Sequence, residues 1–262
     1  MPATSMTTKL RPGWRIAVAA FVLAAAAAAV LGPSDSGALE TNDGCPNPDP
    51  IYRAHDSANA PQVFYIGDSI SANADQKAIY AEKNWAKGWK TLVIARGGAK
   101  IQTHRCLNWL SFYWAHESSA RAVVVELGTN DIFQINDGNA GSPPPPMPPN
   151  QRLTEISKVF TEVNWVADYL RSKCVVWVGL NHYRDSIAND KDTALAFNRH
   201  LQDLEDNHPN LHYASYATLV RDNTTFYNSL YVDSGHDTIH PTFPGKWELG
   251  AWVTRQVDNF CI

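Results

Sequence analysis

Five short apolar segments, rich in valine, isoleucine and alanine, constrain the fold of this chain more than any other feature of its sequence. They cover residues 63–66, 91–95, 122–127, 174–180 and 211–214. Longer segments with helical spacing lie between them, at 72–86, 151–172 and 191–206. Continuous apolar strands that alternate with helices are typical of a buried parallel sheet with crossover helices on both faces. We therefore expect a three-layer α/β fold with a central parallel sheet of five strands.

Polar motifs, three of which contain glycine, follow four of these segments at the point where each predicted strand ends. They are Gly67-Asp68-Ser69, Arg96-Gly97-Gly98, Gly128-Thr129-Asn130-Asp131 and Asn181-His182-Tyr183. In open parallel sheets the ligand site lies beyond the carboxyl ends of the strands. The positions of the motifs therefore predict an active site at that end of the sheet.

Ser69 is the best candidate for a catalytic nucleophile, because it follows a predicted strand and precedes a segment with helical spacing. A helix N-terminus carries a partial positive charge, but a serine hydroxyl also needs a base to take its proton. The candidate base is His240, and Asp237, three residues earlier, is close enough on a turn to orient the imidazole. For Ser69 taken alone, the alternative is an ordinary helix N-cap.

His236 and His240 are four residues apart, which suggests a metal-binding pair on a helix. The zinc-protease motif requires a glutamate directly after the first histidine, and Asp237 stands there instead. Pro241 also disfavours a helix that runs through His240. We therefore expect neither a metal nor another cofactor at this site.

Gly98 and Asn130 are candidates for the donors that stabilise the oxyanion of a tetrahedral intermediate. They stand at the ends of the second and third predicted strands. The backbone of a glycine allows close approach, and the side-chain amide of an asparagine is a fixed donor. The structural alternatives are a simple turn at Gly97-Gly98 and a helix cap at Asn130-Asp131, with Asp131 doing no more than capping.

Four motifs, taken in order, resemble those of the SGNH (GDSL-type) hydrolases. They are Gly67-Asp68-Ser69-Ile70, Arg96-Gly97-Gly98-Ala99, Gly128-Thr129-Asn130-Asp131 and Asp237-Thr238-Ile239-His240-Pro241. The first motif has isoleucine where the family name has leucine. The resemblance covers about residues 63 to 260 and implies a flavodoxin-like sheet and metal-free ester hydrolysis through an acyl-enzyme.

The resemblance also implies a role for each matching residue. Ser69 would be the nucleophile, His240 the general base and acid, and Asp237 the residue that orients the histidine. The implied oxyanion hole consists of the backbone N–H groups of Ser69 and Gly98 and the side chain of Asn130.

Further residues at the strand ends are candidates for substrate contacts. They are Asp68, Gly97, Asn181 and His182. Gly97 is not placed in the oxyanion hole, because Gly98 with Ala99 better matches the family's glycine followed by a small residue. For the Asn181-His182 pair, a solvated loop is an equally good interpretation.

The first 38 residues have the pattern of a secretory signal peptide. Lys9, Arg11 and Arg15 precede an apolar run at 16–31, and Ser36-Gly37-Ala38 supplies the small residues of a cleavage site. An uncleaved membrane anchor is the alternative, although the run is shorter than the roughly 20 residues that span a bilayer comfortably. Both interpretations place the catalytic domain at 62–262 outside the cytoplasm, after an irregular lead-in at 39–61.

Four cysteines, at positions 45, 106, 174 and 261, follow the expected cleavage site. They have no CxxC spacing, and in an exported protein an even number suggests up to two disulfides. Four cysteines allow three connectivities, and their spacing does not choose among them. Buried free cysteines are the alternative.

A proline-rich segment at 134–150 interrupts the α/β rhythm directly after the third motif. It contains six prolines, four of them consecutive, which favour an extended conformation over a helix or an interior strand. Because the α/β pattern continues on both sides, we interpret it as an insertion within one domain and not as a domain linker. We expect it to shape access to the site.

The formal net charge of −4 and the absence of a lysine or arginine run argue against a nucleic-acid binder. We expect an exported, monomeric serine esterase that acts on a small-molecule, glycan or lipid ester and meets a membrane only through an uncleaved N-terminal segment. O-acyl groups on extracellular or cell-envelope glycans are slightly favoured over lipase- or lysophospholipase-type esters, because the chain is rich in aromatic residues and lacks a long apolar lid. Acyl transfer by the same triad and a non-catalytic glycan-binding module are the remaining alternatives.

Overall fold

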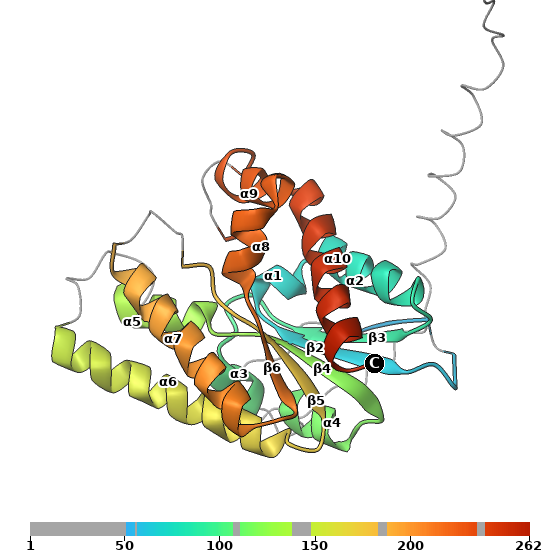
Figure 1. Ribbon diagram of the computed structural model, residues 1–262, viewed down its shortest axis with the longest axis horizontal. Coiled ribbons are helices and arrows are strands. Elements are labelled where there is room, and N and C mark those ends of the chain that lie inside the picture. Colours follow the sequence, from blue (N-terminus) through green and yellow to red (C-terminus); the bar gives the residue numbers. More distant parts are fainter. Residues whose placement is uncertain (1–50, 56, 107–110, 138–147, 183–187, 235–238) are drawn as a thin grey trace, which may run out of the picture. The chain divides into compact units, whose positions relative to one another are not determined.

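A computed structural model describes the chain from residue 51 onward, with short gaps. The described residues are 51–55, 57–106, 111–137, 148–182, 188–234 and 239–262. Their central feature is a sheet of six strands in the order β1-β3-β2-β4-β5-β6 (Figure 1). The strands are β1 (Tyr52–Ala54), β2 (Gln62–Gly67), β3 (Lys90–Ala95), β4 (Ala120–Glu126), β5 (Cys174–Val178) and β6 (Leu211–Ala214).

Strands β2 to β6 are parallel to one another and correspond to the five apolar segments of the sequence. The sixth strand, β1, pairs antiparallel with β3 at the edge of the sheet. It lies within the segment predicted as an irregular lead-in, so that prediction was wrong for residues 52–54. Three residues are too few for a periodic signal, and the pairing with β3 supplies the hydrogen bonds that make them a strand.

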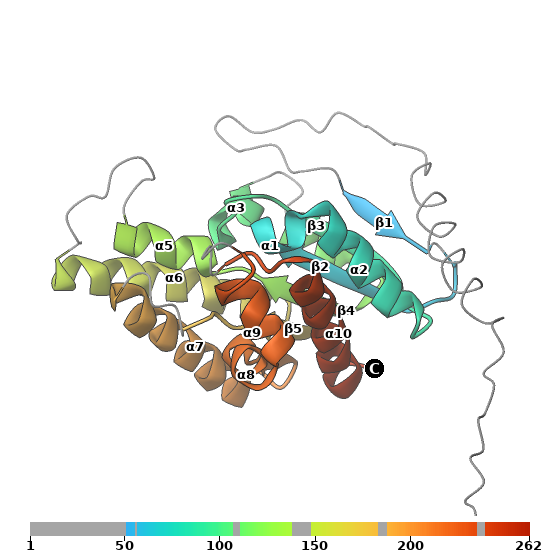
Figure 2. The same ribbon diagram turned by 90° about the horizontal axis from the view of Figure 1, so that it is seen from above.

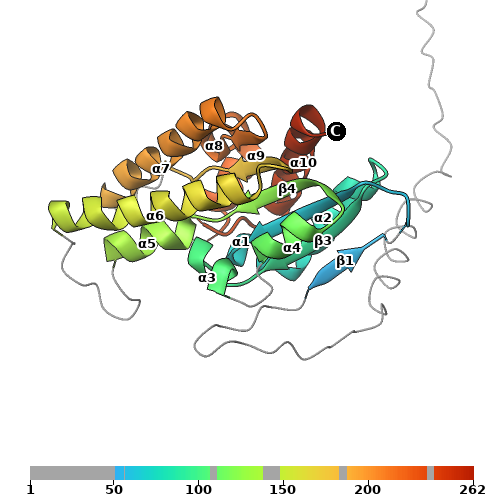
Figure 3. The same ribbon diagram turned by 90° about the horizontal axis from the view of Figure 1, so that it is seen from below.

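Ten helices are described, and they cover both faces of the sheet. They are α1 (Ser69–Ala72), α2 (Ala74–Trp85), α3 (Ile101–Cys106), α4 (Ser111–Glu117), α5 (Thr129–Asp137), α6 (Pro149–Tyr169), α7 (Ala188–Asn207), α8 (Tyr216–Asp222), α9 (Thr224–Tyr231) and α10 (Phe243–Phe260). Helices α2, α8, α9 and α10 lie on one face, which Figure 2 shows from above. Helices α3 to α7 pack on the other, and Figure 3 shows that side. The three-layer prediction is confirmed.

The two ends of the proline-rich segment are helical, which corrects the expectation that residues 134–150 contain no helix. Helix α5 continues to Asp137, and α6 begins at Pro149. Proline is tolerated in the first turn of a helix because its missing N–H would have no partner there. The consecutive prolines at 143–146 lie outside the described residues.

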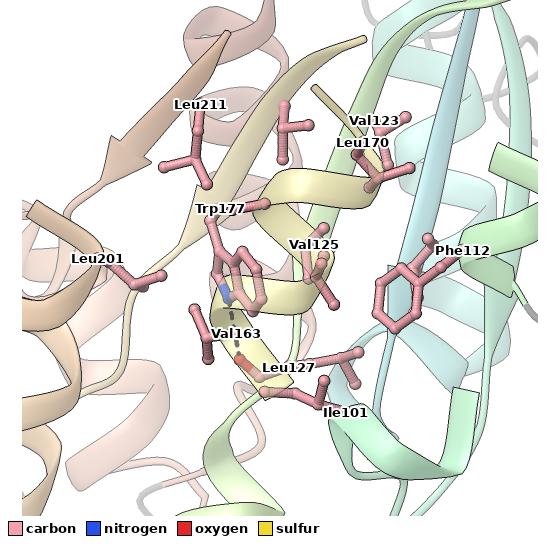
Figure 4. Close-up of a cluster of buried hydrophobic side chains, with 14 of the residues drawn as sticks. Ile101, Phe112, Val123, Val125, Leu127, Val163, Leu170, Trp177, Leu201 and Leu211 are labelled. Carbon is pink, nitrogen blue, oxygen red and sulfur yellow. Dashed lines mark hydrogen bonds between the residues drawn. The ribbon is translucent and has the colours of Figure 1, made fainter. Parts of the chain in front are cut away.

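Side chains of successive strand residues point to opposite faces of the sheet, so the core has two apolar layers, one on each face. In the layer beneath α3 to α7, Trp177 is fully buried, and its indole N–H donates to the carbonyl oxygen of Leu127 at 3.2 Å (Figure 4). Side chains such as Val163 and Leu201 reach this layer from α6 and α7. Because both faces are buried, the strands have continuous apolar sequences and do not alternate between apolar and polar residues.

A disulfide joins Cys174, at the start of β5, to Cys261, just after α10, with their Cα atoms 5.6 Å apart. This confirms the expectation of a disulfide for one pair. Cys45 and the side chain of Cys106 lie outside the described part. Where residues are described, no helix combines the length and the hydropathy needed to cross a bilayer. The apolar run at 16–31 is not among them.

Candidate active site

Ser69 is the first residue of the short helix α1, and only Asp68 separates it from Gly67, the last residue of β2. The cap of this helix is Asp68, whose carboxyl oxygen accepts the N–H of Ile70 at 3.0 Å. Ser69 is therefore not the N-cap, which removes the structural alternative for this residue. A Cβ at Gly67 would collide with Ser71, so only glycine allows the helix to begin so close to the strand end.

His240 approaches Ser69 from the loop before α10, across 171 positions of the sequence. Its Nε2 lies 2.7 Å from the Ser69 Oγ, a hydrogen-bond distance. A serine hydroxyl in contact with an imidazole nitrogen is the arrangement in which the imidazole can accept the proton as the oxygen attacks. Asp237, predicted to orient His240, lies outside the described residues, as does His236.

Asn130, in the first turn of α5, brings the third motif into contact with the first two. Its Nδ2 donates to the carbonyl oxygen of Ala99 at 3.0 Å and lies 3.4 Å from an oxygen of Asp68. Gly97 and Gly98 form the exposed turn before Ala99. Gly98 has φ +72°, a left-handed conformation that favours glycine. The fold thus gathers the Ser69, Gly98 and Asn130 motifs at one end of the sheet.

Asp68, one of the expected substrate contacts, is buried. It is 1% exposed, and its two oxygens face Ile70 and Asn130. Burial raises the pKa of its carboxyl group to about 7. The N–H of Ile70 partly counteracts that shift, and the nearby Glu126 adds to it. These contacts favour a role in holding the turn at residues 67–70 that carries Ser69, here called the nucleophile turn, over the substrate-binding role that we expected.

Asp131 caps a helix, as expected, but the helix is α3 and not its own. Both carboxyl oxygens lie 3.3 Å from the N–H of Ile101, the first residue of α3. The side chain is buried, and burial raises the pKa of its carboxyl group to about 7. Asn130 and Asp131 therefore both bond the backbone around the start of α3, at Ala99 and Ile101 respectively.

A buried glutamate, Glu126, stands at the end of β4 and was not identified from the sequence. One of its oxygens accepts the hydroxyl of Tyr80 at 2.6 Å, and the other accepts the hydroxyl of Ser71. Burial raises the pKa of the glutamate, and these two hydroxyl groups partly oppose that shift. The signal that could have revealed it is its position as the only charged residue in the otherwise apolar segment 122–127.

Asn181 and His182 follow β5 and lie on another side of the site. The Nδ2 of Asn181 donates to the hydroxyl of Tyr231 at 2.9 Å. The Nδ1 of His182 lies 3.3 Å from the Nδ2 of Asn198, and burial lowers the pKa of the imidazole. Asn181 lines a pocket, so a substrate contact is open to it.

That pocket runs beside the Ser69–His240 pair and is mostly apolar. Its volume is about 660 Å³, including the part that is open to solvent. The neighbours in sequence of the three main candidates, Ile70, Thr129 and Ile239, line its near side. The remaining lining residues are Glu126, Leu127, Ile132, Phe133, Val178, Gly179, Leu180, Asn181, Ala194, Tyr216 and Leu249.

No cluster of three or more histidine, cysteine, aspartate or glutamate side chains suited to a metal ion occurs within the described ranges. The carboxyl groups of Asp68 and Glu126 are buried, and they accept hydrogen bonds from a backbone N–H and from two hydroxyl groups respectively.

The chain matches no family model, and no curated protein matches its sequence. Its fold does match solved structures. The acetylxylan esterase Axe2 from Geobacillus stearothermophilus has a TM-score of 0.57 at 12% identity, over 75% of this chain and 94% of that one. The lipase Lip_vut3 from a goat rumen metagenome has a TM-score of 0.57 at 16% identity, over 77% and 98%.

A third similar structure is the C-terminal catalytic domain of peptidoglycan O-acetyltransferase A from Streptococcus pneumoniae. Its TM-score is 0.52 at 11% identity, over 76% of this chain and 94% of that one. A GDSL-like lipase from Parabacteroides merdae is also similar, with a TM-score of 0.52. At such low identities the likeness shows the fold, and this chain has the fold of the SGNH (GDSL-type) hydrolases that its motifs predicted.

Proposed function

We propose that this chain is an extracytoplasmic serine esterase with Ser69 as its nucleophile. The observation that carries the proposal is the 2.7 Å contact between the Ser69 Oγ and the His240 Nε2. It occurs at the carboxyl end of a parallel sheet, where such folds bind ligands. The four motifs in family order and the SGNH-type fold support the same activity.

In the proposed reaction the Ser69 Oγ attacks the ester carbonyl carbon while His240 Nε2 takes the hydroxyl proton. The tetrahedral intermediate collapses when His240 returns that proton to the departing alcohol, which leaves an acyl group on Ser69. A water molecule then gives a proton to His240 as its oxygen attacks the acyl carbon. His240 returns this proton to the Ser69 Oγ when the bond between that oxygen and the acyl carbon breaks, which releases the acid and restores the free serine. Asp237 is the proposed partner that stabilises the protonated imidazole.

The proposed oxyanion donors are the N–H groups of Ser69 and Gly98 and the side-chain amide of Asn130. One hydrogen of the Asn130 amide is held by the carbonyl of Ala99 at 3.0 Å. The other faces Asp68 at 3.4 Å, a long contact that an oxyanion can replace. The contact with Ala99 would therefore orient the amide, and its second hydrogen would serve the reaction.

Covalent labelling with a fluorophosphonate probe tests the nucleophile directly. We expect the purified chain to be labelled and to hydrolyse p-nitrophenyl acetate, and Ser69→Ala to lose both properties. His240→Ala should lose nearly all of both rates, because the serine then lacks its base. Ser157→Ala, on the exposed face of α6, is the matched control and should behave as the wild type. Labelling that persists in Ser69→Ala would refute the assignment.

Glycan O-acyl groups remain the first proposed substrate class. An acetylxylan esterase and a peptidoglycan O-acetyltransferase are among the proteins with this fold. The apolar pocket beside Ser69 supports a second candidate, a lipase-type esterase. An acyl chain longer than acetyl could pack against the apolar surface of this pocket. Rates on p-nitrophenyl acetate and p-nitrophenyl palmitate separate the two classes. Release of acetate from acetylated xylan or peptidoglycan would support the first, and a strong long-chain preference would exclude it.

Hydrolysis and acyl transfer would use the same residues and differ only in the acceptor. Incubating the chain with an acyl donor and an oligosaccharide distinguishes them, because transfer yields acylated sugar and hydrolysis yields the free acid. We propose hydrolysis, and acylated sugar as the main product would contradict it.

The extracytoplasmic location rests on the N-terminal pattern and on the disulfide between Cys174 and Cys261, since disulfides persist in oxidising compartments. N-terminal sequencing of the exported protein should find Leu39 as its first residue. A protein that keeps residues 16–31 and sediments with membranes would favour the anchor.

A further inference from the structure

A buried histidine, His104, contacts the turn that carries Ser69, yet the proposed reaction makes no use of it. It belongs to α3, outside all four motifs, and is 2% exposed. Its Nε2 lies 2.9 Å from the carbonyl oxygen of Gly67, the last residue of β2. Its Nδ1 lies 2.6 Å from the hydroxyl oxygen of Ser111, the first residue of α4.

These two partners define the state of the imidazole ring. A carbonyl oxygen can only accept, so the Nε2 carries a hydrogen and donates it to Gly67. In the neutral ring the Nδ1 then accepts the hydroxyl hydrogen of Ser111. Burial lowers the pKa of His104 to about 4, and the positive charge of Arg96 acts in the same direction. The contact with Gly67 opposes the shift, and the ring is neutral at neutral pH.

The carbonyl of Gly67 sets the direction in which the chain enters the nucleophile turn. It also accepts the N–H of Arg96 at 3.2 Å. Because a peptide unit is planar, holding this carbonyl also holds the N–H of Asp68, the residue directly before Ser69. On its other side Gly67 packs against Ser71, with no room for a Cβ.

We propose that His104 is a positioning residue for the nucleophile. Its Nε2–H holds the peptide plane between Gly67 and Asp68, and through it the direction of the Ser69 Oγ towards His240 and the ester carbonyl. The helix that carries His104 is in turn capped by Asp131, the neighbour of Asn130. Helix α3 therefore contacts both the turn that carries Ser69 and the residue next to the proposed oxyanion donor. This inference rests on the proposed esterase function and adds a residue that the motifs do not contain.

A purely structural histidine would affect folding but not the chemical step, and a pair of variants separates these roles. His104→Met keeps the length of the side chain and removes the donor to Gly67. His104→Gln has nearly the same shape and retains an N–H at the distance of the Nε2. Displacing a reacting group by a fraction of an ångström lowers rates strongly, so we expect kcat to fall about ten- to hundred-fold in the Met variant. KM should change little, and the Gln variant should recover most of kcat.

Thr254→Val is the matched control for a lost buried hydrogen bond. Its hydroxyl donates to Asn84 at 3.2 Å from α10, within the layer on the other face of the sheet. Thr254→Val should lower the melting temperature and leave kcat unchanged, whereas His104→Met should lower both. Equal kcat values for the Met variant and the wild type would overturn the positioning role.

Ser111→Ala tests the same chain of contacts without changing His104. It frees one side of the ring, and we expect a smaller fall in kcat than in the Met variant, again at unchanged KM. An unchanged kcat in Ser111→Ala would count against the proposal even where His104→Met does not fold. Labelling of the wild type with the fluorophosphonate probe keeps the two hypotheses apart. No labelling would overturn the esterase function and this role together, whereas normal labelling in every variant at equal rates would overturn only the role of His104.

Discussion

Replacing Asp131 by asparagine should change how the stability of this protein depends on pH. Asp131 is 7% exposed, and its carboxyl group accepts a hydrogen bond from the N–H of Ile101 at the start of α3. Burial raises its pKa from the ordinary value of 3.8 to about 7. The folded protein therefore retains a proton on Asp131 at pH values where the unfolded chain has already lost it.

The sign and size of the effect follow from proton linkage. Between about pH 4 and pH 7 the folded state binds more protons at this group, so the free energy of unfolding falls as the pH rises. A shift of roughly three pKa units, at about 1.4 kcal/mol for each unit, corresponds to about 4 kcal/mol. The asparagine side chain does not titrate. As the pH rises from acidic to alkaline, the free energy of unfolding of Asp131→Asn, relative to that of the wild type, should therefore increase by about 4 kcal/mol. The opposite contribution of His104, whose pKa is lowered, is present in both proteins and cancels in the difference.

Urea denaturation followed by tryptophan fluorescence, at pH values from about 4.5 to about 8.5, measures this difference. Ser157→Ala is the control, because this residue is exposed on α6 and neither of the two side chains titrates. The control should give a difference from the wild type that does not vary with pH. A difference for Asp131→Asn that is equally constant would refute the reasoning, whatever its absolute size.

Three further substitutions probe the fold around the site. Replacing Cys174 and Cys261 together by serine opens a loop with a sequence separation of 87, and should lower the free energy of unfolding by about 4 to 5 kcal/mol in denaturant titrations. Gly128→Ala should cost ~3 kcal/mol and reduce kcat, because Gly128 has φ +122° and the new Cβ would lie 2.6 Å from the ring of Phe197. Trp177→Phe should lower stability by about 1 to 3 kcal/mol, because it leaves a buried carbonyl without its donor. Unaltered melting curves would contradict each of these.

The parallel sheet was predictable because each strand is buried on both faces and has a continuous apolar sequence. The edge strand at Tyr52–Ala54 was not, since it is short and depends on β3 for its hydrogen bonds. The ends of α5 and α6 were also missed. Their residues lie within a proline-rich segment whose composition argues against helix, although Pro149 stands where a helix accepts proline.

Within the candidate site, the residues found from the sequence are those that belong to local motifs. Ser69, Asn130 and His240 each stand beside a glycine, a proline or an acidic residue in a recognisable order. Glu126 and His104 have no such context. A glutamate at the end of a valine run, or a histidine in a short helix, acquires a meaning only from the groups that face it.

The sequence by itself determined the fold class, the order of the motifs and the identity of the candidate nucleophile. These depend on local composition and on side-chain periodicity, which are properties of neighbouring residues. Only the tertiary structure brought the His240 imidazole within 2.7 Å of Ser69 and placed His104 against the carbonyl of Gly67. Such contacts join segments that are distant in the chain, and their geometry is decided by how the helices pack on the sheet.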